Sequence, residues 1–381
     1  MTWYKLSEDG VLTIKTGCKE IPSGFFSNRA DIKEVYISLS VRKIGNKAFF
    51  QCSNIKKITI PKRGLRFIGD DAFSCCTSLE EFDIPTTVVR IGKSAFNSCH
   101  SIKDIVIPYG VSILQENTFF YCTSLERVRL PPTLKEIHQM SFFTCTKMKS
   151  IKVPNSVYSI GDFVFSCCFN LENIQLSKNI QLFGNYVFSS CSNLLSITVP
   201  KRVKHIPEGF CRGCSNLENV SISDKVEVIG KNAFDGCTKL RNVHLSNSLT
   251  HISYGAFSLC ESIQFITIPK SVLGIEGNAF RGCSKLRRII LKNPNTLYDV
   301  SAFTDCVSLE LKKSYIVGKF KNLKKKTHIE VEKCPITCEQ FTNKSRVILL
   351  ECGHIFMEPA FREWEKQGGK FCPCCRRPIC L

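Results

Sequence analysis

Four residues near the end of the chain have the types and spacing of a zinc site. Cys352 and His354 are separated by one residue, 17 residues follow, and then come Cys372 and Cys375, separated by two. Thiolate and imidazole are ligands that zinc prefers, and two closely spaced pairs can close a tetrahedron around one ion. Because the protein would supply all four ligands, no coordination position stays open. The predicted site is therefore structural rather than catalytic.

The segment that carries these residues, 334–381, is short and rich in cysteine. A module of this size buries little apolar surface, so bound metal would supply much of its folding free energy. One short helix is predicted for the sequence PAFREWEKQ at 359–367, which is followed by Gly368 and Gly369. Glycine commonly ends a helix, because it adopts the left-handed conformation without steric cost.

The segment resembles a RING finger of ubiquitin ligases and, in part, the related U-box. The third, fourth, seventh and eighth ligands of the RING pattern hold its second zinc ion, and they match Cys352, His354, Cys372 and Cys375. The resemblance therefore implies zinc as a cofactor at one site.

The first zinc site of the RING pattern is incomplete here. Its first two ligands match Cys334 and, with one extra residue between them, Cys338, whereas its other two positions hold Met357 and Ala360. Neither of these side chains suits zinc. Three alternatives remain open: a metal-free site held by packing and hydrogen bonds as in U-boxes, a degenerate and inactive module, or a site that recruits another ligand from among Cys374, Cys380 and Glu358.

The resemblance also implies a contact surface for a ubiquitin-conjugating enzyme. In the family this surface combines an apolar residue inside the first cysteine pair, a tryptophan of the central helix, a proline and a basic residue beside the last ligands. The matching residues are Ile336, Trp364, Pro373 and Arg376. Such a finger performs no covalent chemistry; it would hold the charged enzyme near a substrate and restrain the thioester for attack.

The rest of the chain is a repeat, which would bind the substrate of this module. Phenylalanine returns in one slot, with a step of 23 residues except for one step of 24, at positions 26, 49, 73, 96, 119, 142, 165, 188, 234, 257, 280 and 303. Cys211 alone interrupts the series, and from Phe49 onward a cysteine lies three residues after each slot. A fixed period of this length is typical of solenoids.

Each repeat unit reads as one coil with a short strand and a turn-rich return. The portion L-x-x-I-x-I alternates as a half-buried strand does, and proline or serine then ends it. One coil cannot bury its apolar face alone, so stacked coils should share a core of Leu, Ile, Val, Phe and Cys around a parallel β-ladder. The cysteines are expected to act as small buried hydrophobic residues with weak thiol donors.

The pattern I-P-x-x-V-x-x-I-G-x-x-A-F-x-x-C-x-x-L resembles the BspA-type leucine-rich repeat over roughly residues 15–310. The resemblance implies a right-handed solenoid with a binding face, and residues 3–14 are similar to the N-terminal caps of such arrays. We therefore expect a repeat solenoid at 1–310, a basic linker or end cap at 311–333, and a small α+β RING-like zinc module at 334–381.

The outward side of the strands is the predicted contact face. Most of its positions are polar, as in a solvated sheet; the apolar exceptions are Val106, Phe265 and Ile290. They are candidate hot spots for a partner, although single exposed apolar residues are also ordinary.

Composition favours an intracellular protein, cytoplasmic or nuclear. The chain has 381 residues, of which 43% are hydrophobic, and none of its stretches approaches the roughly 18 apolar residues that span a bilayer. The opening sequence lacks the pattern of a secretory signal, and 23 cysteines, 12 of them in the repeat slot, suit a reducing compartment. The net charge of +19 comes without a basic patch interleaved with aromatic residues along the sequence, so neither nucleic acid nor membrane is an expected partner.

Two functions follow as hypotheses. The first is a RING-type ubiquitin ligase in which the solenoid binds a protein substrate and the finger recruits a ubiquitin-conjugating enzyme. The alternative is a non-enzymatic protein-binding scaffold with a degenerate zinc finger. The incomplete first zinc site favours the scaffold, whereas the four residues of the predicted enzyme contact favour the ligase. A surface adhesin is a third class, which the lack of a secretory signal disfavours.

Overall fold

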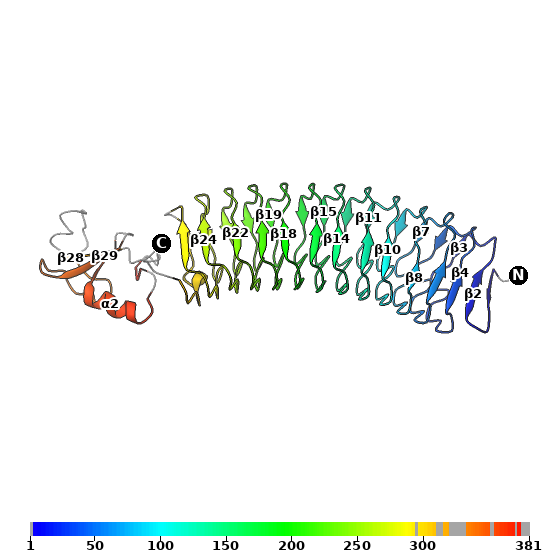
Figure 1. Ribbon diagram of the computed structural model, residues 1–381, viewed down its shortest axis with the longest axis horizontal. Coiled ribbons are helices and arrows are strands. Elements are labelled where there is room, and N and C mark those ends of the chain that lie inside the picture. Colours follow the sequence, from blue (N-terminus) through cyan, green and yellow to red (C-terminus); the bar gives the residue numbers. More distant parts are fainter. Residues whose placement is uncertain are drawn as a thin grey trace.

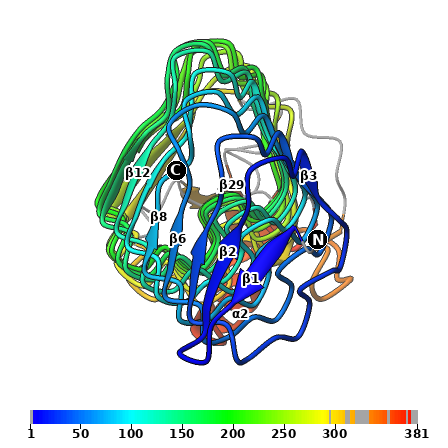
Figure 2. The same cartoon turned by 90° about the vertical axis from the view of Figure 1, so that its right-hand side faces the viewer.

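The computed structural model describes residues 3–293, 296–309, 315–319, 333–350, 354–369 and 372–374. Up to residue 309 the chain winds into a long row of stacked coils (Figure 1). Seen from the N-terminal end, successive coils follow nearly the same outline (Figure 2). This is the parallel β-solenoid that the repeat predicts.

Each coil contributes one strand to the main ladder. These strands are β2 Val11–Ile14, β4 Glu34–Tyr36, β6 Lys57–Thr59, β8 Glu81–Phe82, β10 Asp104–Val106, β12 Arg127–Arg129, β14 Ser150–Lys152, β16 Asn173–Gln175, β18 Ser196–Thr198, β20 Asn219–Ser221, β22 Asn242–His244, β24 Phe265–Ile268 and β26 Arg288–Leu291. Where neighbours pair, they pair in parallel and one coil apart, as in Asp104 with Arg127. The middle residue points inward and the two flanking residues point to solvent.

A second ladder of shorter strands forms where the sequence predicted only a turn-rich return. Its members are β3 Glu20–Ile21, β5 Lys43–Ile44, β7 Phe67–Ile68, β9 Arg90–Ile91, β11 Ile113–Leu114, β13 Glu136–Ile137, β15 Ser159–Ile160, β17 Leu182–Phe183, β19 His205–Ile206, β21 Val228–Ile229, β23 His251–Ile252, β25 Gly274–Ile275 and β27 Leu297–Tyr298. These strands also pair in parallel. The expectation of one strand per coil was therefore wrong. The sequence did not predict the second strand, because two residues are too few to show alternation.

The repeated phenylalanines form a buried internal stack. From Phe26 to Phe188, neighbouring ring centroids lie 5.4 to 5.6 Å apart with nearly parallel planes. At the interrupted slot Phe210, one residue before Cys211, supplies the ring and meets Phe188 edge-on at 5.3 Å. Stacking resumes from Phe234. The core is thus continuous through the one coil that departs from the pattern.

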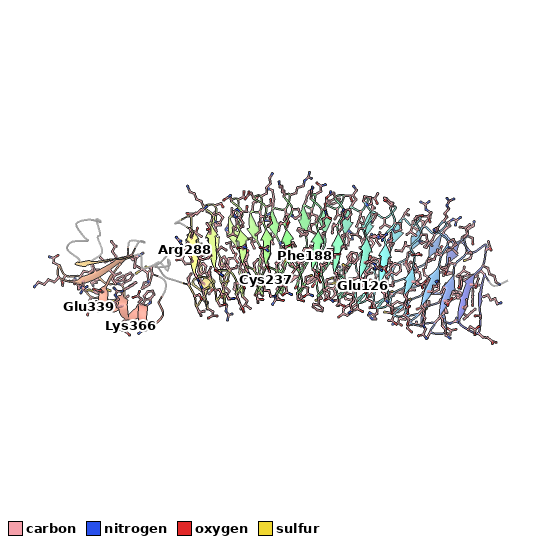
Figure 3. The ribbon with its side chains drawn as sticks, viewed as in Figure 1. Glu126, Phe188, Cys237, Arg288, Glu339 and Lys366 are labelled. Carbon is pink, nitrogen blue, oxygen red and sulfur yellow. The ribbon has the colours of Figure 1, made fainter. Side chains whose placement is uncertain are left out.

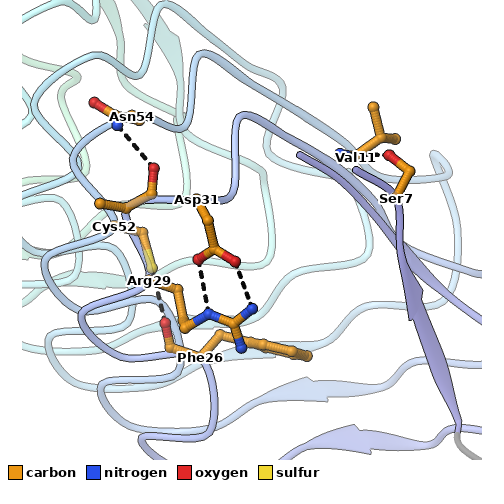
Figure 4. Close-up of polar contacts among 8 residues, drawn as sticks. Ser7, Val11, Phe26, Arg29, Asp31, Cys52 and Asn54 are labelled. Atoms are coloured by element: carbon orange, nitrogen blue, oxygen red, sulfur yellow. Dashed lines mark hydrogen bonds and ion pairs between the residues drawn. The ribbon is translucent and has the colours of Figure 1, made fainter. Parts of the chain in front are cut away.

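The repeated cysteines form a second internal ladder. Each thiol from Cys52 to Cys306 donates to a backbone carbonyl of the preceding coil, over 2.9 to 3.3 Å. Figure 4 shows the first of these bonds, from Cys52 to Phe26. Burial raises the pKa of Cys122 to about 12. The thiols therefore act as small hydrophobic donors, as the repeat predicts.

A hairpin covers the N-terminal end of the array. Strand β1, Tyr4–Leu6, pairs with β2 in antiparallel fashion. The rings of Trp3 and Tyr4 contact Phe26 at centroid distances of 5.7 and 5.2 Å. Together they shield the first ring of the stack from solvent. At the other end of the array the short 3-10 helix η1 spans Val300–Phe303.

The C-terminal region forms a separate small sheet with one helix. Strands β28 Tyr315–Lys319, β29 Arg346–Leu350 and β30 Ile355–Met357 pair in antiparallel order, and α2 spans Glu358–Lys366. The helix ends at Lys366, and Gly368, two residues beyond it, has a φ of +90°, as the sequence predicts for the end of a helix. Strand β28 lies in the segment expected to be a linker, so the sheet begins earlier than residue 334.

Candidate functional site

The strand face, by which we mean the outward side of the main ladder from β2 to β26, carries two rows of exposed side chains. The charge of these side chains changes along the array. Over the first coils the rows are charged, and opposite charges meet between neighbouring strands: Lys57 pairs with Glu81 at 2.5 Å, and Arg127 pairs with Asp104. These pairs are exposed, so each contributes little to stability. They leave this part of the face close to neutral.

Four consecutive coils of the same face carry no charged residue in either row, counting the histidine as neutral. Their outward residues are amides, hydroxyls and one imidazole: Asn173, Gln175, Ser196, Thr198, Asn219, Ser221, Asn242 and His244. Such groups can exchange hydrogen bonds with a partner without the large desolvation cost that charges carry.

The two outward apolar residues near the C-terminal end lie on adjacent strands. Phe265 is 60% exposed and Ile290 is 39% exposed. The register pairs Phe265 with Arg288 and Thr267 with Ile290, so the two apolar side chains lie diagonally across β24 and β26. Arg288 is labelled on this face in Figure 3.

A hollow adjoins Phe265 on the side of β22. It has a volume of about 450 Å³ and is lined by Arg241, Asn242, Val243, His244, Ser262, Gln264 and Phe265. An aromatic edge beside a polar hollow is the arrangement of an interface anchor with a polar rim.

Val106 does not join this group. It lies on β10, seven strands of the main ladder before β24, and its partner in the register is Arg129. Its exposed fraction is 54%. The structure therefore brings together two of the three predicted contact residues and leaves the third alone among charges.

Two of the predicted enzyme-contact residues pack against the core of the C-terminal region. This core consists of Cys334, Ile348, Leu350, Phe356, Phe361 and Cys372, and both Ile336 and Trp364 lie partly buried against it. The ring of Trp364 is 5.4 Å from that of Phe361. Pro373 is partly buried, and Arg376 lies outside the described residues.

The sulfur of Cys334 is held by hydrogen-bond donors. Its side chain is buried, and the backbone N–H of Met357 donates to Sγ over 3.3 Å. Burial by itself raises the pKa of this thiol, but the N–H groups of Met357, Thr337 and Ile336 outweigh burial and lower it below the usual value. These N–H groups therefore stabilise the Cys334 thiolate relative to that of an ordinary cysteine. Cys338 is exposed and has a φ of +58°.

The predicted zinc ligands are described only in part. His354 is partly buried just before β30 and Cys372 is buried, whereas Cys352 and Cys375 lie outside the described residues. Within the described ranges no three His, Cys, Asp or Glu side chains are grouped to hold a metal ion. Where the first site would need a ligand, Met357 instead packs its side chain against the core.

Comparisons with known proteins identify the array. The family model for the BspA type leucine rich repeat region matches residues 19–142, 112–222 and 204–331. The chain belongs to this family. This match confirms the resemblance to the BspA-type leucine-rich repeat that the repeat pattern indicated.

Two solved structures resemble the BspA-type array. A leucine-rich repeat protein from Bacteroides ovatus is 26% identical to this chain, with a TM-score of 0.63. The aligned region covers 81% of this chain and 91% of that protein. A leucine rich cell surface protein from Faecalibacterium prausnitzii is 27% identical with a TM-score of 0.50, over the same shares. No curated protein matches the chain.

The BspA-type match includes strand β28 but not the rest of the C-terminal region. It stops at residue 331, so residues 334–381 are not part of it. Among the described residues no helix is long and apolar enough to cross a membrane. The array is thus shown to be a leucine-rich repeat scaffold of the kind that binds proteins, whereas the role of the C-terminal module rests on its own residues.

The second ladder of the BspA-type coils carries exposed residues that the sequence analysis missed. Phe67, Leu182 and Leu297 stand at its outward positions with 41%, 65% and 78% of their surface exposed. A sequence reading that compared equivalent positions of successive repeats outside the main strand would have found them.

Proposed function

We propose that the protein is a protein-binding scaffold whose partner contacts the C-terminal part of the strand face. The observation that carries the proposal is the exposed pair Phe265 and Ile290 on adjacent strands beside a polar hollow. Large apolar side chains that lose their exposed surface at the centre of an interface supply most of its binding energy.

The uncharged coils beside this pair support the same location. The eight outward polar groups from Asn173 to His244 can hydrogen-bond to the main chain of a partner as a polar rim does. The charged coils nearer the N-terminus would cost more to desolvate. A partner is therefore expected to cover the face from β24 to β16 and to stop before the charged coils from β6 to β12.

A matched set of variants tests the location. Full-length protein carrying Phe265→Arg or Ile290→Arg would be compared with Val106→Arg in quantitative affinity isolation with cross-linking. Each change places a cation at an exposed strand position, so protein stability should be nearly unaffected. A direct partner should be retained by wild type and by Val106→Arg, and lost at least tenfold with either of the other two. Equal retention by all variants would refute the proposed face.

As a second function we propose that the C-terminal module recruits a ubiquitin-conjugating enzyme, which would make the scaffold a RING-type or U-box-type ligase. The observation that favours it is the packing of Ile336 and Trp364 against one small core. In the RING resemblance these two residues form the enzyme groove. The strand face would then hold the substrate while the module holds the charged enzyme near it.

Zinc is part of this second proposal. Cys352, His354, Cys372 and Cys375 would hold the ion, and their sulfur and imidazole donors suit it. The ion would supply folding free energy to the module and no catalytic chemistry. The first site is better explained as metal-free, because Met357 packs against the core and its N–H bonds to the Cys334 sulfur.

An autoubiquitination assay with a panel of conjugating enzymes tests the second function. Wild type should form ubiquitin chains, Ile336→Ala and Arg376→Ala should reduce them at least tenfold, and Cys372→Ser should abolish them. Lys366→Ala, which removes a side chain at the end of α2, is the matched control and should match wild type. If protein that still binds zinc formed no ubiquitin chains with any enzyme, the ligase function would be refuted and only the scaffold function would remain.

We also propose an intracellular location. The proposal is supported by the buried thiol ladder, in which cysteines such as Cys52, Cys122 and Cys260 donate to backbone carbonyls, since an oxidising compartment favours disulfides. The similar protein from Faecalibacterium prausnitzii is a cell surface protein. Microscopy of the tagged protein in its own cells distinguishes the two locations.

A further inference from the structure

Basic residues gather on the second ladder at the N-terminal end of the array, around one exposed aromatic ring. Phe67 on β7 is 41% exposed and stands in register between Lys43 on β5 and Arg90 on β9. The row beside it carries Arg42 and Arg66, whose backbones are joined by an N–H to carbonyl bond of 2.9 Å. Because coils stack at roughly 4.8 Å, residues 23 or 24 positions apart become neighbours.

The one repeat that is longer than 23 residues adds two more cations to this surface. The only 24-residue step contains Lys62, Arg63 and Gly64, and both cations are exposed. Gly64 has a φ of +112°, and a Cβ there would lie 2.7 Å from the Leu39 carbonyl oxygen. Arg42 donates to that same oxygen over 2.7 Å. The inserted loop is therefore pressed against Arg42, and insertions in repeat arrays often mark the binding face.

Most of this charge has no internal counterion. We define the N-terminal basic patch as Lys19, Arg42, Lys43, Lys62, Arg63, Arg66 and Arg90 around Phe67. Glu20 is the one carboxylate in the two rows over these coils, and it pairs with Lys43 at 2.8 Å. Among the described residues no ion pair joins the other six cations to a carboxylate. The first coils of the strand face, by contrast, neutralise their charges in pairs.

We propose that the N-terminal basic patch binds single-stranded nucleic acid. Unpaired guanidinium and ammonium groups attract phosphates, and an exposed ring among them offers a platform on which a base can stack. A duplex keeps its bases inside the helix and could not use the ring, and an acidic peptide would satisfy the cations without using it. This binding is separate from the proposed protein contact, because Phe67 is on the second ladder near the opposite end of the array.

The test is fluorescence anisotropy with full-length protein and labelled 12-mers of deoxythymidine and of uridine as the probes. Wild type should bind at near-physiological salt. Phe67→Ala should weaken binding about tenfold, the scale of one stacked base. Arg66→Ala with Arg90→Ala should lower the slope of log affinity against log salt by about 1.4, since each phosphate contact contributes about 0.7 on single strands.

Matched controls separate a site from general basicity. Phe265→Ala removes an exposed ring on the other ladder, and Lys178→Ala with Lys225→Ala removes two exposed cations outside the patch. All of these should leave the affinity within twofold of wild type. Any one of three results overturns the proposal. The first is absence of binding to both probes, and the second is an equal loss of affinity in patch and control variants. The third is binding of a labelled polyglutamate peptide as tightly as the 12-mers, with an affinity that Phe67→Ala does not change. The last result would assign the patch to an acidic protein.

Discussion

The ring of Phe142 lies between those of Phe119 and Phe165, with 5.6 Å between centroids on each side. It is fully buried, so Phe142→Ala would leave a cavity that the rigid stack cannot close. We expect the free energy of unfolding to fall by about 3 to 5 kcal/mol. Phe265→Ala, at an exposed position, should change it by less than about 0.5 kcal/mol. Chemical denaturation of both variants measures the difference, and similar midpoints would contradict the role given to the stack.

Burial also sets the chemistry of the thiol ladder. With the pKa of Cys122 raised to about 12, about one thiol in ten thousand is ionised at pH 8, and the thiolate is the reactive form. Iodoacetamide should therefore spare Cys122 in the folded protein and modify the exposed Cys338. Peptide mass spectrometry measures both. In denaturant the two should react alike, and rapid labelling of Cys122 without denaturant would show that the coils open readily.

At the scale of the coil, glycine matters where two turns approach each other. Gly209 has a φ of +60°, and a Cβ there would lie 2.1 Å from the Tyr186 ring of the preceding coil. Gly209→Ala should cost about 2 to 4 kcal/mol, because left-handed strain and steric overlap add. Gly213→Ala is the matched control: its φ is +74° and the nearest atom is 3.6 Å away, so it should cost about 1 kcal/mol.

A double variant separates the two causes at Gly209. Adding Tyr186→Ala removes the obstructing ring, so the cost of Gly209→Ala should then approach that of Gly213→Ala. Equal costs of Gly209→Ala with and without the tyrosine would mean that the backbone angle alone requires glycine. The unfolding midpoints of the four proteins in the cycle decide between these outcomes.

Sequence alone predicted the main strand and the inward residues of each coil, because a single period repeats the same short pattern many times. It did not predict the second ladder, since Lys43–Ile44 and its equivalents are too short to alternate. It also left Cys211 as an interruption. The replacement ring, Phe210, could be placed only once its contact with Phe183 at 5.0 Å was known.

At the scale of the whole molecule, sequence predicted an array followed by a small module, but not how the surface of the array is divided. Phe265 and Ile290 could be read as outward, yet their separation from Val106 depends on the stacking of coils. The N-terminal basic patch was invisible along the sequence because its residues come from four coils. Linear motifs locate a site only when its residues are close in the chain.

The array and the C-terminal region should respond independently to the loss of zinc. Coils of a solenoid contact only their neighbours, and the small core around Phe356 and Phe361 includes only C-terminal residues. If zinc supports that core, a chelator such as 1,10-phenanthroline should speed amide hydrogen exchange in 333–350 and 354–369. Exchange in the coils from residue 32 to 293 should stay unchanged, and adding zinc should restore protection.

Cys372→Ser provides the control for that experiment. It should reproduce the fast exchange of the C-terminal segments without chelator, and chelation should then have no further effect. Two results would contradict the prediction. Unchanged protection of the Phe356 region in metal-free protein would mean that packing alone holds the module, and faster exchange in the coils would mean that the two parts fold together. Either result bears directly on the ligase proposal, because enzyme recruitment by Ile336 and Trp364 requires a folded core beneath them.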